Sequence, residues 1–194
     1  MRSLEYVPYP DLYGRPHVFV DGLRAPGTVL ELSHWPGNRT PHRLKDDVST
    51  QSVLRLLALA DHERDSLLGG ASAVTCDHYD VDGLLSVLCL TRPEFALRHR
   101  SLLAAVAVCG DFDVYTGDAA VQVCLALLAA ERAVFTRIAP VSVDQAAAAL
   151  FRGDAGRRRG LRAAAGCVAV RVGGRVEPDH AVGRLSRRPP RGTH

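Results

Sequence analysis

Residues 71–86 read Ala-Ser-Ala-Val-Thr-Cys-Asp-His-Tyr-Asp-Val-Asp-Gly-Leu-Leu-Ser, and this stretch is the clearest indication of the fold. Its first part, Ala71–Cys76, is a short apolar run with β-favouring residues, which predicts a strand. A polar loop follows, and Gly83–Leu90 is apolar enough to predict a buried helix. A strand, a polar loop and a helix in this order are typical of α/β proteins.

Two further strands are predicted before this unit. His17–Asp21 and Thr28–Ser33 are short and rich in apolar residues, and the glycine-containing turn between them suits a hairpin or two adjacent strands. After a polar loop, Ser49–Ala60 carries apolar residues at helical spacing. We expect an amphipathic helix there, with Asp47 or Ser49 as its N-cap.

Helices are predicted to dominate the following segment. Pro93 suits the first turn of a helix that runs to Val108, and Gly110–Asp113 is expected to break it. Asp118 then caps an apolar helix that reaches about Ala133. We therefore expect a three-layer α/β fold, in which the three predicted strands form a mainly parallel sheet with helices on both faces.

The chain divides into three parts by composition. Residues 1–16 are rich in Pro and Tyr without periodicity, so we expect an irregular N-terminal arm. Residues 17–151 form the α/β domain, which a capping box at Ser142–Gln145 extends towards its end. Residues 152–194 are rich in Arg and lack an apolar period, which predicts a disordered basic tail. Contact of this tail with nucleic acid is a less favoured alternative.

Size and cysteine usage limit the class of protein. A chain of 194 residues with 47% hydrophobic content can bury one good core, so a single domain is expected. The five cysteines are odd in number and widely spaced, which is typical of a reducing compartment. No apolar run approaches the roughly 18 to 20 residues of a membrane helix. We therefore expect a cytoplasmic protein that does not enter a membrane.

The loop after the strand at Ala71–Cys76 has a pattern that suits metal binding. In an extended loop alternate side chains point the same way, so His78, Asp80 and Asp82 can converge on one point. A mixture of imidazole and carboxylate ligands favours Mn²⁺ or Mg²⁺ over a structural zinc. Such an ion would lower the pKa of a bound water and offset charge on phosphoryl oxygens. Gly83 would relieve the turn, and the helix N-terminus would favour phosphate.

This pattern, His-x-Asp-x-Asp-Gly-x-x-Ser after a strand, resembles the first motif of the DHH phosphoesterases, which are metal-dependent hydrolases and exonucleases. The resemblance covers the strand, the loop and the start of the helix. It implies that His78, Asp80 and Asp82 are metal ligands, and that the substrate is a small phosphate-containing molecule or an oligonucleotide. The Asp-His-His triplet that names the family does not occur in this sequence. Taken whole, the chain looks more like an uncharacterised bacterial family that shares the aspartate loop.

A second polar loop follows the strand at Thr28–Ser33. His34 could bind metal or donate a proton, and Asn38 with Arg39 could hold a phosphate. If the strands are parallel neighbours, this loop and the His78 loop meet at the carboxyl edge of the sheet. We therefore expect the following roles: catalysis by His34 and Asp82, substrate binding by Asn38 and Arg39, and metal binding by His78, Asp80, Asp82 and Asp111.

Several alternatives remain open at this point. Asp80-Val-Asp82-Gly also resembles the haloacid dehalogenase-like phosphatases, in which Asp80 would be the nucleophile and Asp82 the acid/base. The aspartates could instead cap a turn in a non-catalytic binding protein. The loop with His34 could be an ordinary surface turn, and a solvated role is the more frequent one for residues such as Asp111 and Asp21.

Overall fold

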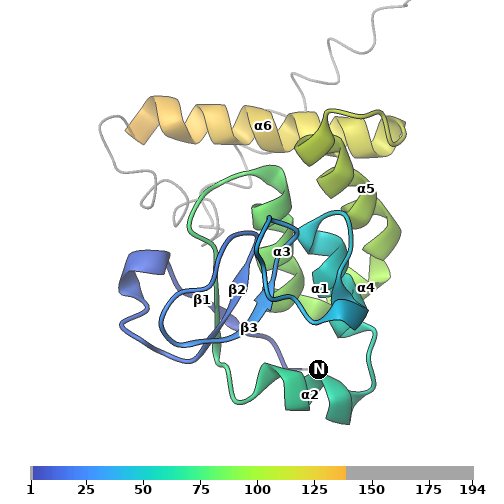
Figure 1. The fold of residues 1–194 in the computed structure, drawn as a ribbon. Coiled ribbons are helices and arrows are strands. Elements are labelled where there is room, and N and C mark those ends of the chain that lie inside the picture. The colour runs from blue at the N-terminus through green and yellow to red at the C-terminus, as the bar shows by residue number, and fades with distance from the viewer. Residues whose placement is uncertain (1, 139–194) are drawn as a thin grey trace, which may run out of the picture.

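The computed structural model describes residues 2–138, which form a parallel sheet and a group of helices (Figure 1). The sheet has four strands in the order β1-β4-β2-β3, and every pair of neighbours is parallel. The predicted α/β class and parallel sheet are confirmed, and all three predicted strands are present. The strands are β1 (Glu5–Tyr6), β2 (His17–Val20), β3 (Thr28–Leu32) and β4 (Ala73–Thr75).

The helices follow the strands and gather mainly on one side of the sheet, as Figure 1 shows. α3 contacts three of the strands and also packs against α1, α4 and α5, so it is the centre of the helical layer. The helices are α1 (Ser49–Leu57), α2 (Asp61–Leu68), α3 (Val81–Thr91), α4 (Pro93–Arg98), α5 (Arg100–Phe112) and α6 (Asp118–Ile138), with single 3₁₀ turns η1 (Tyr9–Asp11) and η2 (His42–Leu44).

The two faces of the sheet are covered in different ways. Val18 and Val74 belong to the main core, which they form with the helices. Ala73, the neighbour of Val74 in β4, instead packs with Val7 and Leu12 of the N-terminal segment. Among the described residues, the longest helices therefore lie on one face of the sheet, and the segment around η1 packs on the other, where the prediction of helices on both faces had expected a helix.

The N-terminal arm is part of the sheet. Glu5–Tyr6 pairs in parallel with β4, and the buried Leu4 donates its N–H to the carbonyl of Leu90 at 3.0 Å. The prediction of an irregular arm is wrong at this point. A two-residue strand is too short to show a period in the sequence, and its partner strand lies far along the chain.

A short connection joins β2 to β3, which lies beside it in the parallel direction. Asp21 turns the chain with a φ of 48°, in the left-handed region, and the segment runs back until Gly27 accepts a hydrogen bond from the N–H of His17 at 3.2 Å. A Cβ at Gly27 would lie 2.7 Å from the carbonyl oxygen of Gly14, so only glycine fits there. Of the two arrangements predicted, adjacent strands are correct and the hairpin is wrong.

The C-terminal boundary of α5 differs from the predicted one because helix packing decides the role of Gly110. Gly110 was expected to break a helix, but α5 continues to Phe112 and ends at Asp113, which has a φ of 53°. A Cβ at Gly110 would lie 2.6 Å from Cβ of Val81 in α3. The glycine is therefore needed for the close approach of the two helices.

Some predictions lie outside the described residues. These are the helix after Ser142, the basic tail at 152–194 and its contact with nucleic acid. In the part of the chain that the structure covers, no helix combines the length and the apolar character that crossing a membrane requires. The four cysteines found there are free thiols.

Candidate metal centre at the carboxyl ends of the strands

Polar side chains from three neighbouring strands meet at one edge of the sheet. Asp21 follows β2, His34 lies two residues beyond β3, and His78 lies in the loop after β4. The ring centroids of Trp35 and His78 are 5.1 Å apart. The predicted meeting of the two loops is thus confirmed, because the carboxyl ends of parallel strands share one edge.

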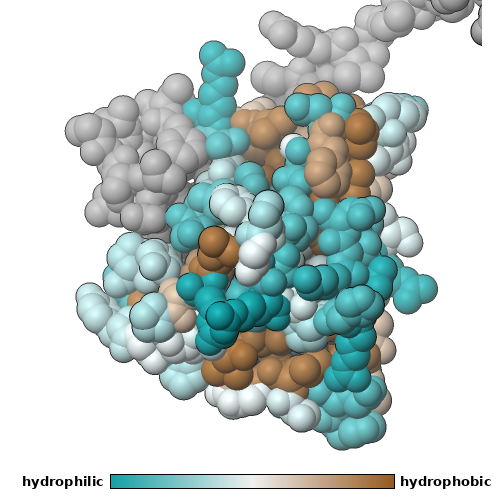
Figure 2. Space-filling view, in the orientation of Figure 1, coloured by the Kyte–Doolittle hydropathy of each residue, from teal (hydrophilic) through white to brown (hydrophobic). Residues whose placement is uncertain are grey.

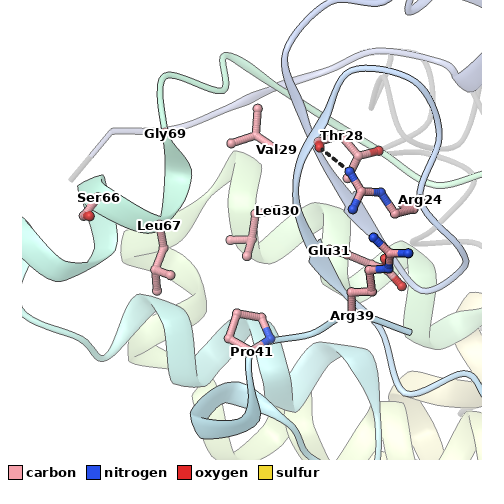
Figure 3. Close-up of a pocket in the computed structure, with 10 residues that line it drawn as sticks. All are labelled: Arg24, Thr28, Val29, Leu30, Glu31, Arg39, Pro41, Ser66, Leu67 and Gly69. Atoms are coloured by element: carbon pink, nitrogen blue, oxygen red, sulfur yellow. Dashed lines mark hydrogen bonds between the residues drawn. The ribbon is translucent and has the colours of Figure 1, made fainter. Parts of the chain in front are cut away.

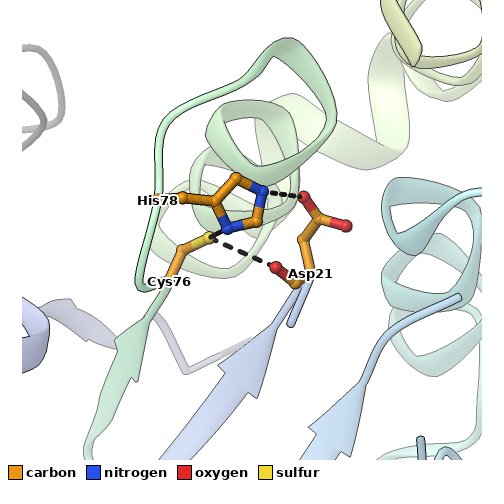
Figure 4. A group of neighbouring side chains, drawn as sticks. All are labelled: Asp21, Cys76 and His78. Carbon is orange, nitrogen blue, oxygen red and sulfur yellow. Dashed lines mark hydrogen bonds and ion pairs between the residues drawn. The ribbon is translucent and has the colours of Figure 1, made fainter. Parts of the chain in front are cut away.

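Asp21 is the centre of this group. It is fully buried; its Oδ1 accepts a hydrogen bond from Oγ of Ser49 at 2.9 Å and lies 3.4 Å from Nε2 of His34. Its Oδ2 lies 3.3 Å from Nε2 of His78 (Figure 4) and forms no hydrogen bond with any described residue. Burial raises the pKa of Asp21, but its contacts with the two histidines and with Ser49 outweigh this and hold the pKa below its usual range.

Sequence reasoning undervalued Asp21, for which a solvated role was the expectation. The available signal was its position directly after the apolar residues 18–20 of the predicted strand. In a parallel sheet that position points into the carboxyl edge, where sites form.

His78 is held by aspartates at both ring nitrogens. Nδ1 lies 2.9 Å from a carboxylate oxygen of Asp77, and Nε2 lies 3.1 Å from Oδ2 of Asp80. These contacts, with that of Asp21 first, raise the pKa of His78 well above its usual range. Asp77 was not among the predicted site residues, although it fixes the ring so that Nε2 faces the other carboxylates.

His34 faces three carboxylates with one nitrogen. Its Nε2 lies 3.4 Å from Asp21, 3.7 Å from Asp111 and 4.0 Å from Asp82. The contact with Asp21 is the main cause of a raised pKa of His34, and burial works against it. The ring also packs edge-on against Phe112, the residue after Asp111 in α5. The C-terminal end of α5 therefore brings Asp111 to the group, as predicted.

Asp82 caps a helix to which it does not belong. Its two carboxylate oxygens accept the backbone N–H groups of Ser49 and Thr50 at 2.7 and 2.8 Å, at the start of α1. The prediction that Asp47 or Ser49 caps this helix is wrong, since Val48 occupies the N-cap position without a side-chain bond. Burial, followed by the charge of Asp21, raises the pKa of Asp82.

Asp80 and Gly83 shape the start of α3. Asp80 is the N-cap residue, and its Oδ1 accepts the N–H of Gly83 at 2.6 Å. Gly83 itself is helical, so the expectation that it relieves a tight turn is wrong. A Cβ there would lie 2.9 Å from Sγ of Cys76 and 3.2 Å from Oδ2 of Asp21, so glycine is required by space.

The structure does not bring Asn38 and Arg39 to this group. The side chain of Asn38 is used within its own loop, where Nδ2 donates to the carbonyl of Trp35 at 2.6 Å and Oδ1 accepts from the N–H of Thr40 at 3.0 Å. Arg39 lines a separate pocket beside β3. Their predicted role in binding a phosphate-containing substrate at this group has no geometric support, because the turn directs both side chains elsewhere.

Within the described part of the chain, two sets of side chains could hold a metal ion, and Asp21 belongs to both. One set is Asp21, Cys76 and His78, and the other is Asp21, His34 and Asp82; within each set the ligand atoms lie within 4.8 Å of one another. Five aspartates approach the two imidazoles, so negative charge remains even when both rings are protonated. These are Asp21, Asp77, Asp80, Asp82 and Asp111.

Fold and site together define an α/β protein with an acidic, histidine-containing cluster at the carboxyl edge of a parallel sheet. The chain belongs to a family of unknown function, DUF6687, whose model matches residues 2–154. The comparisons with curated proteins and with solved structures found no match.

Proposed function

We propose that this protein is a metal-dependent, phosphoesterase-like hydrolase that acts on a phosphate-containing substrate. One observation supports this above the others. The carboxylate of Asp21 directs Oδ1 towards His34 and Oδ2 towards His78. A carboxylate with its two oxygens in two ligand sets is suited to bridge a pair of divalent ions, the arrangement that serves phosphoester hydrolysis in many enzymes.

The residues present fit a divalent ion on three grounds. Oδ2 of Asp21 is buried without a hydrogen bond to a described residue. Asp77 engages Nδ1 of His78, and such a carboxylate partner is typical of metal-binding histidines. The excess of carboxylates would be offset by a cation.

The donor atoms favour Mn²⁺ or Mg²⁺. Carboxylate oxygens predominate, and these suit hard cations. Burial raises the pKa of the Cys76 thiol, which favours its neutral form over the thiolate that zinc prefers. The proposed ligands are His78, Asp80, Asp82, Asp111 and Asp21, and His34 is assigned to proton transfer.

Bound divalent ions would supply a water of lowered pKa and would offset charge on phosphoryl oxygens. The chain itself contributes His34, which can hold a proton at Nε2 beside Asp21 and Asp111 and deliver it to a leaving group. The side chain of His34 is one-fifth exposed, so a substrate can reach it. Asp82 keeps the start of α1 in place under the site.

Calorimetric titration of the full-length protein with Mn²⁺ tests the metal site. We expect saturable binding by the unchanged protein and its loss in His78→Ala/Asp80→Ala. The matched control is His62→Ala/Asp65→Ala, which removes the same residue types from the exposed surface of α2. Absence of Mn²⁺ and Mg²⁺ binding by the folded protein would contradict the proposal.

Hydrolysis of bis(p-nitrophenyl) phosphate and of p-nitrophenyl phosphate with Mn²⁺ tests the reaction. We expect turnover that is lost with EDTA and in the His78→Ala/Asp80→Ala variant. Metal binding without turnover of either ester would retain the metal site and argue against the hydrolase.

A second candidate, a non-catalytic binding protein, is favoured by one specific observation. Asp80 and Asp82 both cap helices, so the aspartate loop already has a structural role. In that case Asp80→Ala would change stability equally with and without metal. In the first candidate, its effect on stability grows when Mn²⁺ is present, because a ligand that binds only the folded state stabilises it.

A further inference from the structure

A second site lies away from the aspartates, in a cavity of about 340 Å³ between β3 and the end of α2 (Figure 3). Its apolar lining comes from Val29 and Leu30 of β3, Leu67 of α2, and Pro41. Figure 2 shows a hydrophobic area beside strongly hydrophilic side chains on the face that carries β3 in Figure 1. The volume lies at the small end of the range for ligand pockets, about 300 to 1,000 Å³.

Three charged side chains gather at one end of this pocket, as Figure 3 shows. Arg24 and Arg39 are exposed, and Glu31 is 4% exposed. Among the described residues, Oε1 of Glu31 has no hydrogen-bond partner, and neither Glu31 nor Arg39 forms an ion pair. A buried carboxylate without a partner is costly, so its presence at the wall of a pocket indicates a ligand that donates to it.

The charges select the kind of ligand. The carboxylate of Glu31 would repel a purely anionic ligand, and the two guanidinium groups would repel a purely cationic one. A molecule that carries both a carboxylate and an ammonium group satisfies all three side chains, because guanidinium pairs well with carboxylate and Glu31 accepts from ammonium. The apolar end of the pocket would then receive an aliphatic side chain.

We propose that the pocket beside β3 binds a free α-amino acid with an apolar side chain. The carboxylate lies between Arg24 and Arg39, the ammonium group faces Glu31, and the side chain packs against Leu67 and Val29. This site is separate from the aspartate cluster and does not depend on the proposed hydrolase activity.

Calorimetry on the full-length protein in EDTA tests the proposal without any contribution from metal. The probes are L-leucine, L-valine, L-methionine and L-phenylalanine, with two analogues of leucine. The first analogue, 4-methylpentanoate, lacks the ammonium group, and the second, 3-methylbutylamine, lacks the carboxylate. We expect saturable binding of at least one amino acid with one molecule per chain, and weaker binding of both analogues.

Substitutions assign each charged group to its partner. Arg39→Ala should lower the affinity for leucine and for 4-methylpentanoate about tenfold, because one charge-assisted hydrogen bond is lost. The affinity for 3-methylbutylamine should not change. Glu31→Gln should weaken the binding of leucine and 3-methylbutylamine and leave the binding of 4-methylpentanoate unchanged. Arg98→Ala removes an exposed arginine of α4 that does not line the pocket, and it should change none of these affinities.

Several outcomes would overturn the proposal. They are no binding of any of the four amino acids by the folded protein, leucine affinities in Glu31→Gln and Arg39→Ala that equal that of the unchanged protein, or tighter binding of 4-methylpentanoate or inorganic phosphate than of leucine. Circular dichroism of each variant confirms that it is folded. Because EDTA is present throughout, failure here leaves the metal-site proposal intact, and failure of Mn²⁺ binding leaves this one intact.

Discussion

The aspartate cluster has an inner and an outer part that differ in how their polar groups are satisfied. In the inner part, Asp82 and Asp21 are fully buried and accept hydrogen bonds of 2.7 to 2.9 Å from Ser49 and Thr50. The outer part consists of His34, His78 and Asp80, which are partly exposed, and His34 lies 3.4 to 4.0 Å from three carboxylates. The inner part therefore stabilises the fold while leaving Oδ2 of Asp21 for an ion, and the outer part is accessible to solvent and to a ligand. The loop after β4 contributes to both parts, with Asp82 in the inner part and His78 and Asp80 in the outer part.

Replacing Asp82 by Ala should have the largest effect on stability. Two backbone N–H groups at the start of α1 would lose their acceptor in a buried site, which costs about 1 to 3 kcal/mol each. We expect a loss of about 3 kcal/mol in the free energy of unfolding, measured by urea denaturation in EDTA. Asp65→Ala, in an exposed position of α2, serves as control. A loss below about 0.5 kcal/mol, the range of ordinary surface changes, would show that α1 does not depend on this cap.

Replacing His78 by Ala should affect metal affinity more than the fold. A mutation of a ligand's supporting partner typically costs 10- to 100-fold in affinity, so we expect loss of a ligand to cost about 100-fold or more for Mn²⁺. The free energy of unfolding in EDTA should fall less than in Asp82→Ala, because His78 is partly exposed. His62→Ala is the control. If the stability loss exceeded that of Asp82→Ala, the division into inner and outer parts would be wrong.

Replacing Gly110 by Ala tests the approach of α5 to α3, which places Asp111 beside His34. Overpacking against Val81 costs about 1 to 3 kcal/mol, and the higher helix propensity of alanine returns about 1 kcal/mol. We expect a net loss of about 1 kcal/mol in urea denaturation. An increase in stability for Gly110→Ala would contradict the close packing.

Stability of the metal-free protein should depend on the charge of His34. Its folded-state pKa is raised above the ordinary value of 6.5, so its contribution is fully present below pH 6.5 and is lost as pH rises through the raised pKa. Urea denaturation in EDTA between pH 6 and 9 should show a decline that His34→Gln reduces. A flat profile for the unchanged protein would indicate that the three carboxylates do not act on the ring.

Replacing Asp111 by Asn should have the smallest effect. The side chain is near the surface and meets His34 at 3.7 Å, so the free energy of unfolding should change by less than about 0.5 kcal/mol. Mn²⁺ affinity should fall a few-fold, and Asp113→Asn should leave it unchanged. Equal affinities in both variants would remove Asp111 from the metal centre.

The outer part of the cluster could largely be predicted from the sequence. In the inner part Asp82 was predicted as a site residue, but neither its contact with the start of α1 nor the central position of Asp21 was predicted. His78 and Asp80 follow an apolar strand and alternate in an extended loop, and such a local pattern is visible in one sequence. Ser49 and Asp82 are distant in the chain, and no local pattern indicates that one helix is capped by a side chain of another. For the same reason Arg39 was predicted to bind substrate at the aspartate cluster, although it lines the pocket beside β3.

The sequence by itself determined the α/β class, the three principal strands and the edge at which the two loops meet. Apolar runs and turn residues act locally, and parallel strands bring their carboxyl ends together once they pair. Only the tertiary structure decided that β1 joins the sheet, that Gly110 lies within a helix and that Asp21 is the centre of the site. These features depend on pairing and close packing between segments that are distant in the chain. Such contacts produce no periodic pattern of apolar residues that the sequence alone would show.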